Sequence, residues 1–332
     1  MEKYTYYFEI AKKIKTPLVI PKATNYVKYR LLKKKPVVKY YTPQIVAVNL
    51  INRCNLSCNY CAQAKDGVFK KPKEEMTLEL IKEFFSHKLL KNCMLVDLLG
   101  GEPLLCKDII PIVEYLSRKG FLTNTSTNGL LLANNIEKLR DAGITRVNVS
   151  VYPDNFNILK NSLSSINRIY QVHASYVLTK TILEKSKQSV FDVVDLAYSS
   201  GCKSLRFWMY RPLGKIPNND EVVLDDSPIY KEFKEELMER YSDFVLFPQT
   251  VSRSYEKKCT QLWQRVSITP TGGIGICCGN FGHIKNKTIC NNSFEEIFNC
   301  TQVVDIRKNL LDNSIPPLEE CKNCNLLSET GW

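Results

Sequence analysis

The sequence predicts an α/β protein, an open or partial (β/α)6 barrel followed by a small C-terminal domain. Between residues 44 and 209, six short apolar runs alternate with helix-like segments. Such alternation favours a parallel sheet with helices on its outside. From about residue 251 the character changes, because cysteines become dense and a β-hairpin and short helices are expected. The 332 residues suffice for one large domain with a smaller appendage.

The predicted strands are rich in β-branched residues. They cover residues 44–51, 94–99, 122–126, 146–151, 172–178 and 204–209. The predicted helices, several of which end at a glycine, a typical stop signal, cover residues 77–91, 108–118, 134–142, 157–170 and 187–199. In the C-terminal part we expect a hairpin over residues 265–278 and two short helices over 293–298 and 302–311.

Charge divides the chain into three parts. Residues 1–45 hold eleven Lys or Arg against two Glu, so this segment contributes +9 of the net charge of +12. We therefore predict a basic, aromatic N-terminal arm at 1–43, the barrel at 44–250 and the C-terminal domain at 251–332. The arm could contact an anionic membrane surface or pack on the barrel as a solvated helix; nucleic acid is disfavoured.

The thirteen cysteines indicate metal or redox chemistry. No apolar run approaches the roughly 18 residues of a membrane span. The N-terminus lacks an apolar signal core, so we expect a cytoplasmic protein. Structural disulfides are disfavoured in that compartment, which leaves metal binding as the more common role of clustered cysteines.

A first group of cysteines follows the first predicted strand. Cys54, Cys58 and Cys61 have the spacing C-x3-C-x2-C. Three thiolates can bind three irons of a [4Fe–4S] cluster and leave the fourth iron open. A structural zinc ion would be one ligand short, because no histidine is near.

Together with Tyr60, these cysteines resemble the C-x3-C-x-Φ-C signature of radical S-adenosylmethionine (SAM) enzymes, in which Φ is aromatic. The resemblance implies that SAM chelates the open iron. Reductive cleavage of SAM then yields a 5′-deoxyadenosyl radical, which abstracts a hydrogen atom from the substrate. A flavodoxin or ferredoxin would supply the electron.

Three further segments match the same family in order. Gly100, Gly101, Glu102 and Pro103 match the GGEP motif, whose backbone and carboxylate bind the SAM ammonium group in that family. Ser126 and Asn128 resemble the segment that meets the SAM ribose, and Ser150 a serine near the ribose or carboxylate. Tyr152 departs from the pattern, because the family often has Asp there. Asn128-Gly129 could also be a simple turn, and Ser150 a simple strand hydroxyl.

A second group of cysteines lies in the C-terminal part and comprises Cys259, Cys277, Cys321 and Cys324. Four thiolates can saturate a second [4Fe–4S] cluster or a structural zinc ion. The spacing resembles the opening of a SPASM domain without its last cysteines, which is the truncated twitch form with one auxiliary cluster. Cys278 could replace Cys277, and Cys290 could replace Cys259.

This cluster layout resembles 2-deoxy-scyllo-inosamine dehydrogenases. The resemblance implies two-electron oxidation of an alcohol on a sugar, aminocyclitol or glycan-linked substrate, with the auxiliary cluster accepting an electron. Tyr210 could assist proton loss, and Arg211 could contact the SAM carboxylate or an anionic substrate group. Both residues could instead be ordinary strand-end packing.

Two other functions stay open, and a third is disfavoured. The enzyme could crosslink or epimerise a ribosomally made peptide, and a non-enzymatic membrane- or nucleic-acid-binding protein with a structural metal is a further alternative. Molybdopterin-precursor synthesis is disfavoured, because the sequence ends Thr330-Gly331-Trp332 where that family carries a C-terminal Gly-Gly.

Overall fold

The computed structural model describes most of the chain. The described residues are 17–32, 34–58, 60–65, 70–152, 155–163, 172–210, 219–224, 226–247, 259–277, 284, 286–312 and 314. Among the candidate site residues named above, Arg211, Cys278, Cys321 and Cys324 lie outside these ranges.

One sheet organises the fold. Its nine strands are ordered β7-β6-β5-β4-β3-β2-β1-β8-β9, so it is open at β7 and β9. All neighbours are parallel except the antiparallel pair β8 and β9. The strands are β1 (Ile45–Asn49), β2 (Leu95–Leu99), β3 (Leu122–Thr127), β4 (Arg146–Ser150), β5 (Val172–Leu178), β6 (Leu205–Met209), β7 (Val245–Leu246), β8 (Arg265–Ile268) and β9 (Ile274–Gly275). The predicted partial barrel is confirmed, and β1–β6 are the six predicted strands.

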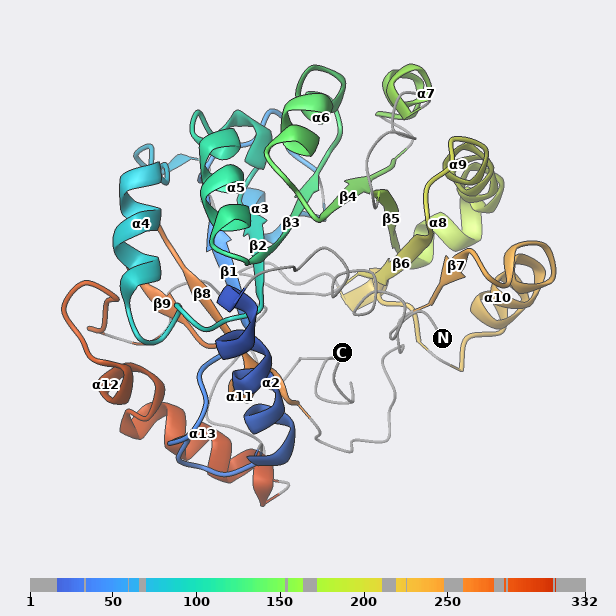
Figure 1. Ribbon diagram of the computed structural model, residues 1–332. Helices are drawn as coiled ribbons and strands as arrows, with labels where there is room; N and C mark the ends of the chain where they lie inside the picture. Colours follow the sequence, from blue (N-terminus) through green and yellow to red (C-terminus); the bar gives the residue numbers. More distant parts are fainter. Residues whose placement is uncertain are drawn as a thin grey trace.

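Helices cover the convex side of the sheet (Figure 1). Those that follow the first six strands are α3 (Ala62–Lys65), α4 (Leu78–Ser86), α5 (Ile109–Arg118), α6 (Leu132–Asp141), α7 (Phe156–Leu163), α8 (Lys180–Lys185), α9 (Lys187–Ser199) and α10 (Pro228–Tyr241). The others are α2 (Ile20–Leu32), α11 (Gln261–Gln264), α12 (Phe294–Phe298) and α13 (Thr301–Leu311). No helix within the described ranges is both long and apolar enough to cross a membrane.

Burial alternates along the strands. In β2, β4, β5 and β6 every second side chain is buried, and the side chains between them are partly exposed. The buried set is apolar and joins the core beneath the outer helices, for example Val147, Val149, Leu205 and Phe207. Because successive side chains of a strand point to opposite faces, the partly exposed set lines the concave face.

The C-terminal strands join the same sheet as the barrel. β8 pairs in parallel with β1, and Ile45 is the partner of Arg265. Beside it, Arg307 of α13 is fully buried and donates hydrogen bonds to the carbonyl oxygens of Leu262 (2.9 Å) and Phe298 (2.8 Å). Burial lowers the pKa of Arg307 to about 10, which leaves the guanidinium charged at neutral pH. This arginine therefore ties α11, α12 and α13 together.

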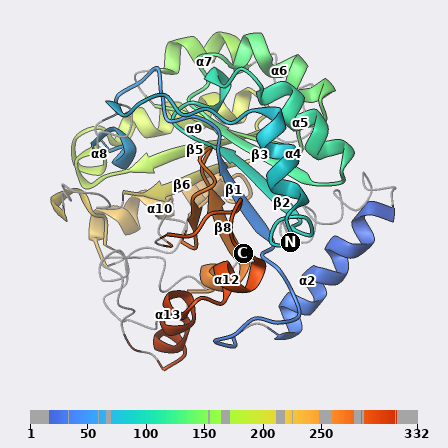
Figure 2. The ribbon, with the colours of Figure 1, turned by 90° about the vertical axis from the view of Figure 1, so that its left-hand side faces the viewer.

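Figure 2 shows α2 at the edge of the molecule, away from α6 and α7.

Candidate metal and cofactor site

The cysteine loop, residues 54–61, lies at the carboxyl end of β1. Cys54, Cys58 and Cys61 are partly buried, and none forms a disulfide. The Cys61 N–H donates to the Cys58 carbonyl oxygen (3.1 Å), which turns the loop before α3 begins at Ala62. In parallel sheets, ligands bind at this edge.

The three sulfur atoms form a donor set that needs positive charge. Burial raises the pKa of Cys54, and repulsion from Glu102, Cys58 and Cys61 raises it further against one hydrogen bond from the Leu56 N–H. A metal cluster stabilises all three thiolates at once. Within the described ranges, no three His, Cys, Asp or Glu side chains converge on a single metal ion. Three thiolates in one loop can each bind a separate iron of a [4Fe–4S] cluster, so the chemistry of this donor set fits such a cluster.

The backbone of the GGEP segment lies directly against the cysteine loop. The Gly101 N–H donates to the Ile51 carbonyl oxygen, and the Glu102 N–H to that of Arg53, both at 2.8 Å. A Cβ atom on Gly101 would lie 2.0 Å from the Arg53 carbonyl oxygen. On Gly100, it would lie 2.6 Å from the Ile51 carbonyl oxygen. Only glycine fits at both positions, because the backbone of the GGEP segment approaches the backbone of residues 51–53 too closely for a Cβ atom.

Glu102 connects the ends of β2 and β3. Its side chain is 1% exposed. Oε1 accepts hydrogen bonds from Thr127 Oγ1 (2.7 Å) and the Leu104 N–H (3.0 Å), and Oε2 accepts one from the Asn128 N–H (2.9 Å). Burial raises the pKa of Glu102, although these three bonds oppose the shift. A carboxylate accepts about four hydrogen bonds, so the protein itself uses most of this capacity. Pro103 starts the 3-10 helix that Glu102 caps.

Of the three predicted ribose-contact residues, Asn128 lies beside the cysteine loop, and Ser126 and Ser150 contact neighbouring strands. The Asn128 side-chain amide donates to Asn55 Oδ1 (2.7 Å) and lies 3.9 Å from Cys54 Sγ. Ser126 accepts a hydrogen bond from Asn148 Nδ2 (3.4 Å). Ser150 Oγ lies 3.4 Å from Ser175 Oγ on the next strand.

Asn155 is a site residue that the sequence analysis missed. It is 1% exposed, and its Nδ2 donates to the carbonyl oxygens of Asn128 and Ser150, both at 2.8 Å. Its Oδ1 accepts from the Tyr152 N–H (2.7 Å). One amide thus holds the ends of β3 and β4 together. An Asn just beyond a strand would be the only sequence signal for this role.

Tyr152, the departure from the family pattern, packs against the aromatic residue of the cysteine motif. The ring centroids of Tyr60 and Tyr152 are 5.1 Å apart. Tyr152 continues to Tyr176 of β5 (5.9 Å), and Tyr176 to Phe207 of β6 (6.4 Å). Burial raises the pKa of Tyr60 and of Tyr152, so both hydroxyls stay protonated at neutral pH.

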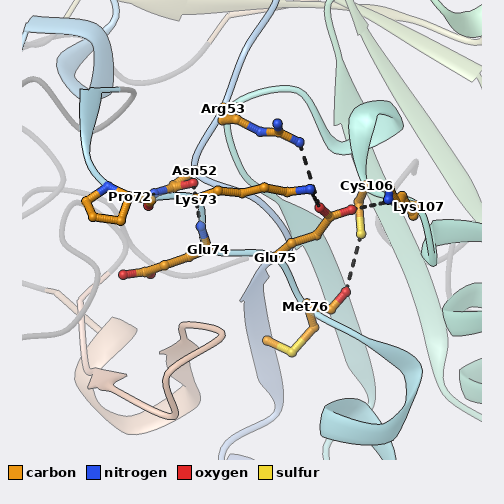
Figure 3. Close-up of polar contacts among 9 residues, drawn as sticks. All are labelled: Asn52, Arg53, Pro72, Lys73, Glu74, Glu75, Met76, Cys106 and Lys107. Atoms are coloured by element: carbon orange, nitrogen blue, oxygen red, sulfur yellow. Dashed lines mark hydrogen bonds and ion pairs between the residues drawn. The ribbon is translucent and has the colours of Figure 1, made fainter.

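A network around Glu75 holds the start of the cysteine loop (Figure 3). Glu75 accepts from the Lys107 N–H (2.7 Å) and forms ion pairs with Lys73 (2.6 Å) and Arg53 (3.7 Å). Burial alone would raise the pKa of Glu75, but the Lys107 N–H and the Lys73 ammonium hold it below its usual value. Arg53 directly precedes Cys54, so this carboxylate fixes the entry to the loop.

Two members of the second cysteine group lie at the amino ends of the parallel strands, on the side of the sheet opposite the cysteine loop. Cys259 precedes α11 at the amino end of β8, and Cys277 follows β9, which runs antiparallel to β8. Both are partly buried and neither forms a disulfide. Cys321 and Cys324 lie outside the described residues, so the four-thiolate site stays a prediction. Cys290 is exposed, and a Cβ on Gly272 would lie 3.0 Å from its Sγ.

Of the two predicted catalytic residues, the structure describes Tyr210. Its N–H donates to the Leu178 carbonyl oxygen (2.9 Å), which places it just beyond β6 at the carboxyl edge. Arg211 lies outside the described residues. The roles of both stay predictions.

The concave face of the sheet is polar, which the sequence analysis did not recognise. Asp97 of β2 pairs with Arg265 of β8 (2.9 Å) and accepts from Asn124 of β3 (3.2 Å). On β4, Arg146 Nε donates to Asn148 Oδ1 (2.9 Å). His173 of β5 lies 2.7 Å from Ser204 Oγ. Burial, followed by Arg146, Arg206 and Lys203, lowers the pKa of His173 to about 3, so the imidazole is neutral.

Fold and site together define an open α/β barrel that carries three thiols at the carboxyl edge of its sheet. Residues 48–204, a little under half of the chain, match the model of the Radical SAM superfamily. A radical SAM domain implies one [4Fe–4S] cluster and SAM as cofactors. Cys54, Cys58 and Cys61 are the thiols that would hold that cluster.

Known proteins are similar to much of this chain. The chain is 26% identical over 291 residues to Molybdenum cofactor biosynthesis protein moc-5 of Caenorhabditis elegans, with 75% of this chain and 46% of that protein covered. It is 29% identical over 263 residues to GTP 3',8-cyclase of Clostridium perfringens (strain SM101 / Type A), with 69% and 79% covered. The chain thus spans about half the length of the worm protein.

Among solved structures, Streptococcus suis SuiB bound to S-adenosylmethionine has the same fold. The TM-score is 0.63 at 15% identity, with 86% of this chain and 71% of SuiB covered. At this identity the likeness concerns the fold alone.

Proposed function

We propose that this chain is a radical SAM enzyme that oxidises an alcohol on a hydroxyl-rich substrate, such as a sugar, an aminocyclitol or a glycan-linked group. The observation that carries this proposal is the polar concave face beside the cysteine loop. Its serine, asparagine, arginine and neutral histidine side chains offer both donors and acceptors to hydroxyl groups.

SAM would bind between the cysteine loop and the ends of β2, β3 and β4. Its methionine end would lie along Gly100–Pro103, and its ribose near Ser126, Asn128 and Ser150. When bound, the [4Fe–4S] cluster supplies the electron that converts SAM into methionine and the 5′-deoxyadenosyl radical. The chain's own contribution is to hold these strand ends in register through Glu102 and Asn155.

In the proposed oxidation, the alcohol carbon would lose its hydrogen atom to the deoxyadenosyl radical, the hydroxyl would lose a proton, and the carbon radical would lose one electron to become a ketone. Tyr210 would assist the proton loss and Arg211 would orient an anionic group. The second cysteine group, with an auxiliary [4Fe–4S] cluster, would accept the electron, and a flavodoxin or ferredoxin would reduce the first cluster.

A second candidate is the cyclisation of GTP. It is favoured by the likeness to GTP 3',8-cyclase, which extends over 79% of the clostridial enzyme. This likeness makes GTP cyclisation a competitor of the alcohol oxidation.

The mass of the product separates the two reactions. Anaerobically reconstituted protein is incubated with SAM, dithionite and, in parallel, aminocyclitols, nucleotide sugars or GTP. Oxidation predicts 5′-deoxyadenosine together with a product two mass units lighter that reacts with a carbonyl reagent. A GTP-derived product of unchanged mass, with no oxidised sugar or cyclitol, would reject the oxidation and support the cyclisation.

A further inference from the structure

Helix α2 is an amphipathic helix with its apolar side turned to the solvent. Ile20, Val27 and Leu31 are 67%, 53% and 77% exposed. Lys22 and Asn25 are each 5% exposed. At 3.6 residues per turn, the apolar set and the buried set lie on opposite sides of the helix. A surface helix usually shows the reverse arrangement.

Specific contacts fix this orientation. Asn25 Nδ2 donates to the carbonyl oxygens of Thr42 (3.2 Å) and Asn92 (3.0 Å). Tyr29 OH donates to Gln264 Oε1 (2.8 Å), and Lys22 Nζ lies 4.1 Å from the centre of the Phe121 ring. Rotation of α2 would break these buried polar contacts, so the exposed apolar side is built into the fold.

The apolar surface extends beyond α2. Ten large hydrophobic side chains are exposed in the described part of the chain, and six of them lie between residues 18 and 40. These six define the α2 face: Leu18, Ile20, Val27, Leu31, Val37 and Tyr40. Scattered single exposed residues are ordinary, whereas such a concentration marks an interaction site.

Positive charge surrounds the α2 face. The sequence from residue 10 to residue 65 contains no Asp or Glu. Beside Ile20 and Tyr40, a cleft of about 470 Å³ is lined by Lys28, Lys39, Lys88 and Lys91, and none of its described lining residues is a carboxylate. Within the described ranges, no ion pair involves any of these four lysines.

We propose that the α2 face docks on an anionic membrane surface, with the lysine cleft taking a phosphate of a lipid headgroup. Exposed aliphatic side chains insert at the boundary of the acyl chains, and the lysines meet the anionic headgroups. Asn25 of α2 contacts Thr42 and Asn92, which lie just before β1 and β2, so α2 lies at the amino edge of the sheet. The cysteine loop lies at the carboxyl edge, and a five-residue strand spans about 16 Å. Docking through α2 therefore leaves the candidate catalytic site clear of the bilayer.

Vesicle sedimentation tests the docking with the full chain. The anaerobically purified protein is mixed with vesicles of phosphatidylcholine alone or with about one-third phosphatidylglycerol, an anionic lipid. We expect sedimentation with the anionic vesicles only, and its loss at high salt. Absence of binding to the anionic vesicles, or equal binding to both kinds, overturns the proposal.

Paired variants assign the binding to the α2 face. Val27→Ser/Leu31→Ser and Lys28→Glu/Lys39→Glu should each weaken binding roughly tenfold or more, because each removes two membrane contacts. Controls are Ile229→Ser/Met238→Ser on α10, where the native side chains are 39% and 38% exposed, and Lys82→Glu/Lys231→Glu. Both should bind as the native chain does. Equal losses of vesicle binding in variants and controls would overturn the assignment to the α2 face. A native dimer that only Val27→Ser/Leu31→Ser dissociates would show that the α2 face is a dimer interface instead.

Discussion

Gly101 and Arg53 lie in backbone contact so close that no residue with a side chain fits at position 101. A Cβ atom there would lie 2.0 Å from the Arg53 carbonyl oxygen and 2.9 Å from the Cys54 nitrogen. The contact links the end of β2 to the first cysteine of the loop. The geometry of the candidate cluster site therefore depends on the GGEP segment before any ligand is bound.

Gly101→Ala should displace the cysteine loop. We expect the reconstituted variant to lose about half of the roughly eight irons that two cubane clusters would hold, together with its SAM cleavage. Gly120→Ala is the control. Gly120 also has a backbone conformation that favours glycine, with a φ of +73°, but it lies between α5 and β3 and is not part of the GGEP segment. It should lower stability by about 1 kcal/mol and keep the full iron content. Normal iron in Gly101→Ala would contradict the described contact.

Glu102→Gln should weaken the joint between β2 and β3. An amide in place of the carboxylate turns one acceptor into a donor that faces either the Asn128 N–H or the Leu104 N–H. The expected loss is about 1–3 kcal/mol of unfolding free energy, since a buried donor is left unsatisfied. Thr127→Ser is the control, because it keeps the hydroxyl that donates to Glu102 and accepts from the Gly129 N–H. It should lose about 1 kcal/mol or less, for the buried methyl group alone. Thermal unfolding of the two variants checks this order, and a larger loss in Thr127→Ser would contradict it.

Asn155→Ala should raise the KM for SAM more than it lowers kcat, because Asn155 positions the ends of β3 and β4 without being part of the cysteine loop. We expect about a tenfold rise, corresponding to one or two lost hydrogen bonds. Asn155→Asp keeps the size of the side chain but sets a carboxylate against two carbonyl oxygens. It should therefore be at least as damaging. A fully active Asn155→Asp enzyme would show that the residue only fills space.

His173 should make the protein sensitive to mild acid. Its folded-state pKa of about 3 lies below the unfolded value of 6.5, so the unfolded chain takes up the proton first as pH falls. Stability is thus constant above about pH 6.5 and declines below it, by roughly 1 kcal/mol per pH unit. Burial, followed by the positive charges of Arg146, Arg206 and Lys203, keeps the imidazole neutral. In His173→Asn, the difference between the unfolding temperatures at pH 7.5 and pH 5.5 should shrink; an unchanged difference would contradict this assignment.

The strands and the cysteine loop could be predicted because local patterns specify them. The runs that form β1–β6 are short, apolar and punctuated, and each was placed within two residues. The pairing of β8 with β1 could not be predicted, because it joins residues about 220 positions apart and leaves no local pattern. A helix of the N-terminal arm packed on the barrel was one alternative, but the bounds and orientation of α2 could not be predicted, since its buried residues Lys22 and Asn25 are polar and its aliphatic residues are exposed.

Some residues of the candidate site could be predicted from the sequence, and others could not. Motif spacing identified Cys54, Gly101 and Glu102, because each has a strict chemical or steric requirement. Asn155 and the polar concave face depend on which strand ends meet in space, and a single buried amide has no motif. The glycine pair was predicted to admit a ligand, and the structure shows that it admits the backbone of the cysteine loop.

The most direct test of the account concerns the three thiols of the cysteine loop. Native protein and the Cys58→Ala variant are reconstituted anaerobically, reduced and mixed with SAM, and the release of 5′-deoxyadenosine is measured alongside the electron paramagnetic resonance of the reduced cluster. The account predicts that SAM changes the spectrum of the native protein and yields the deoxynucleoside, and that the variant does neither. Undiminished deoxynucleoside from Cys58→Ala would contradict it.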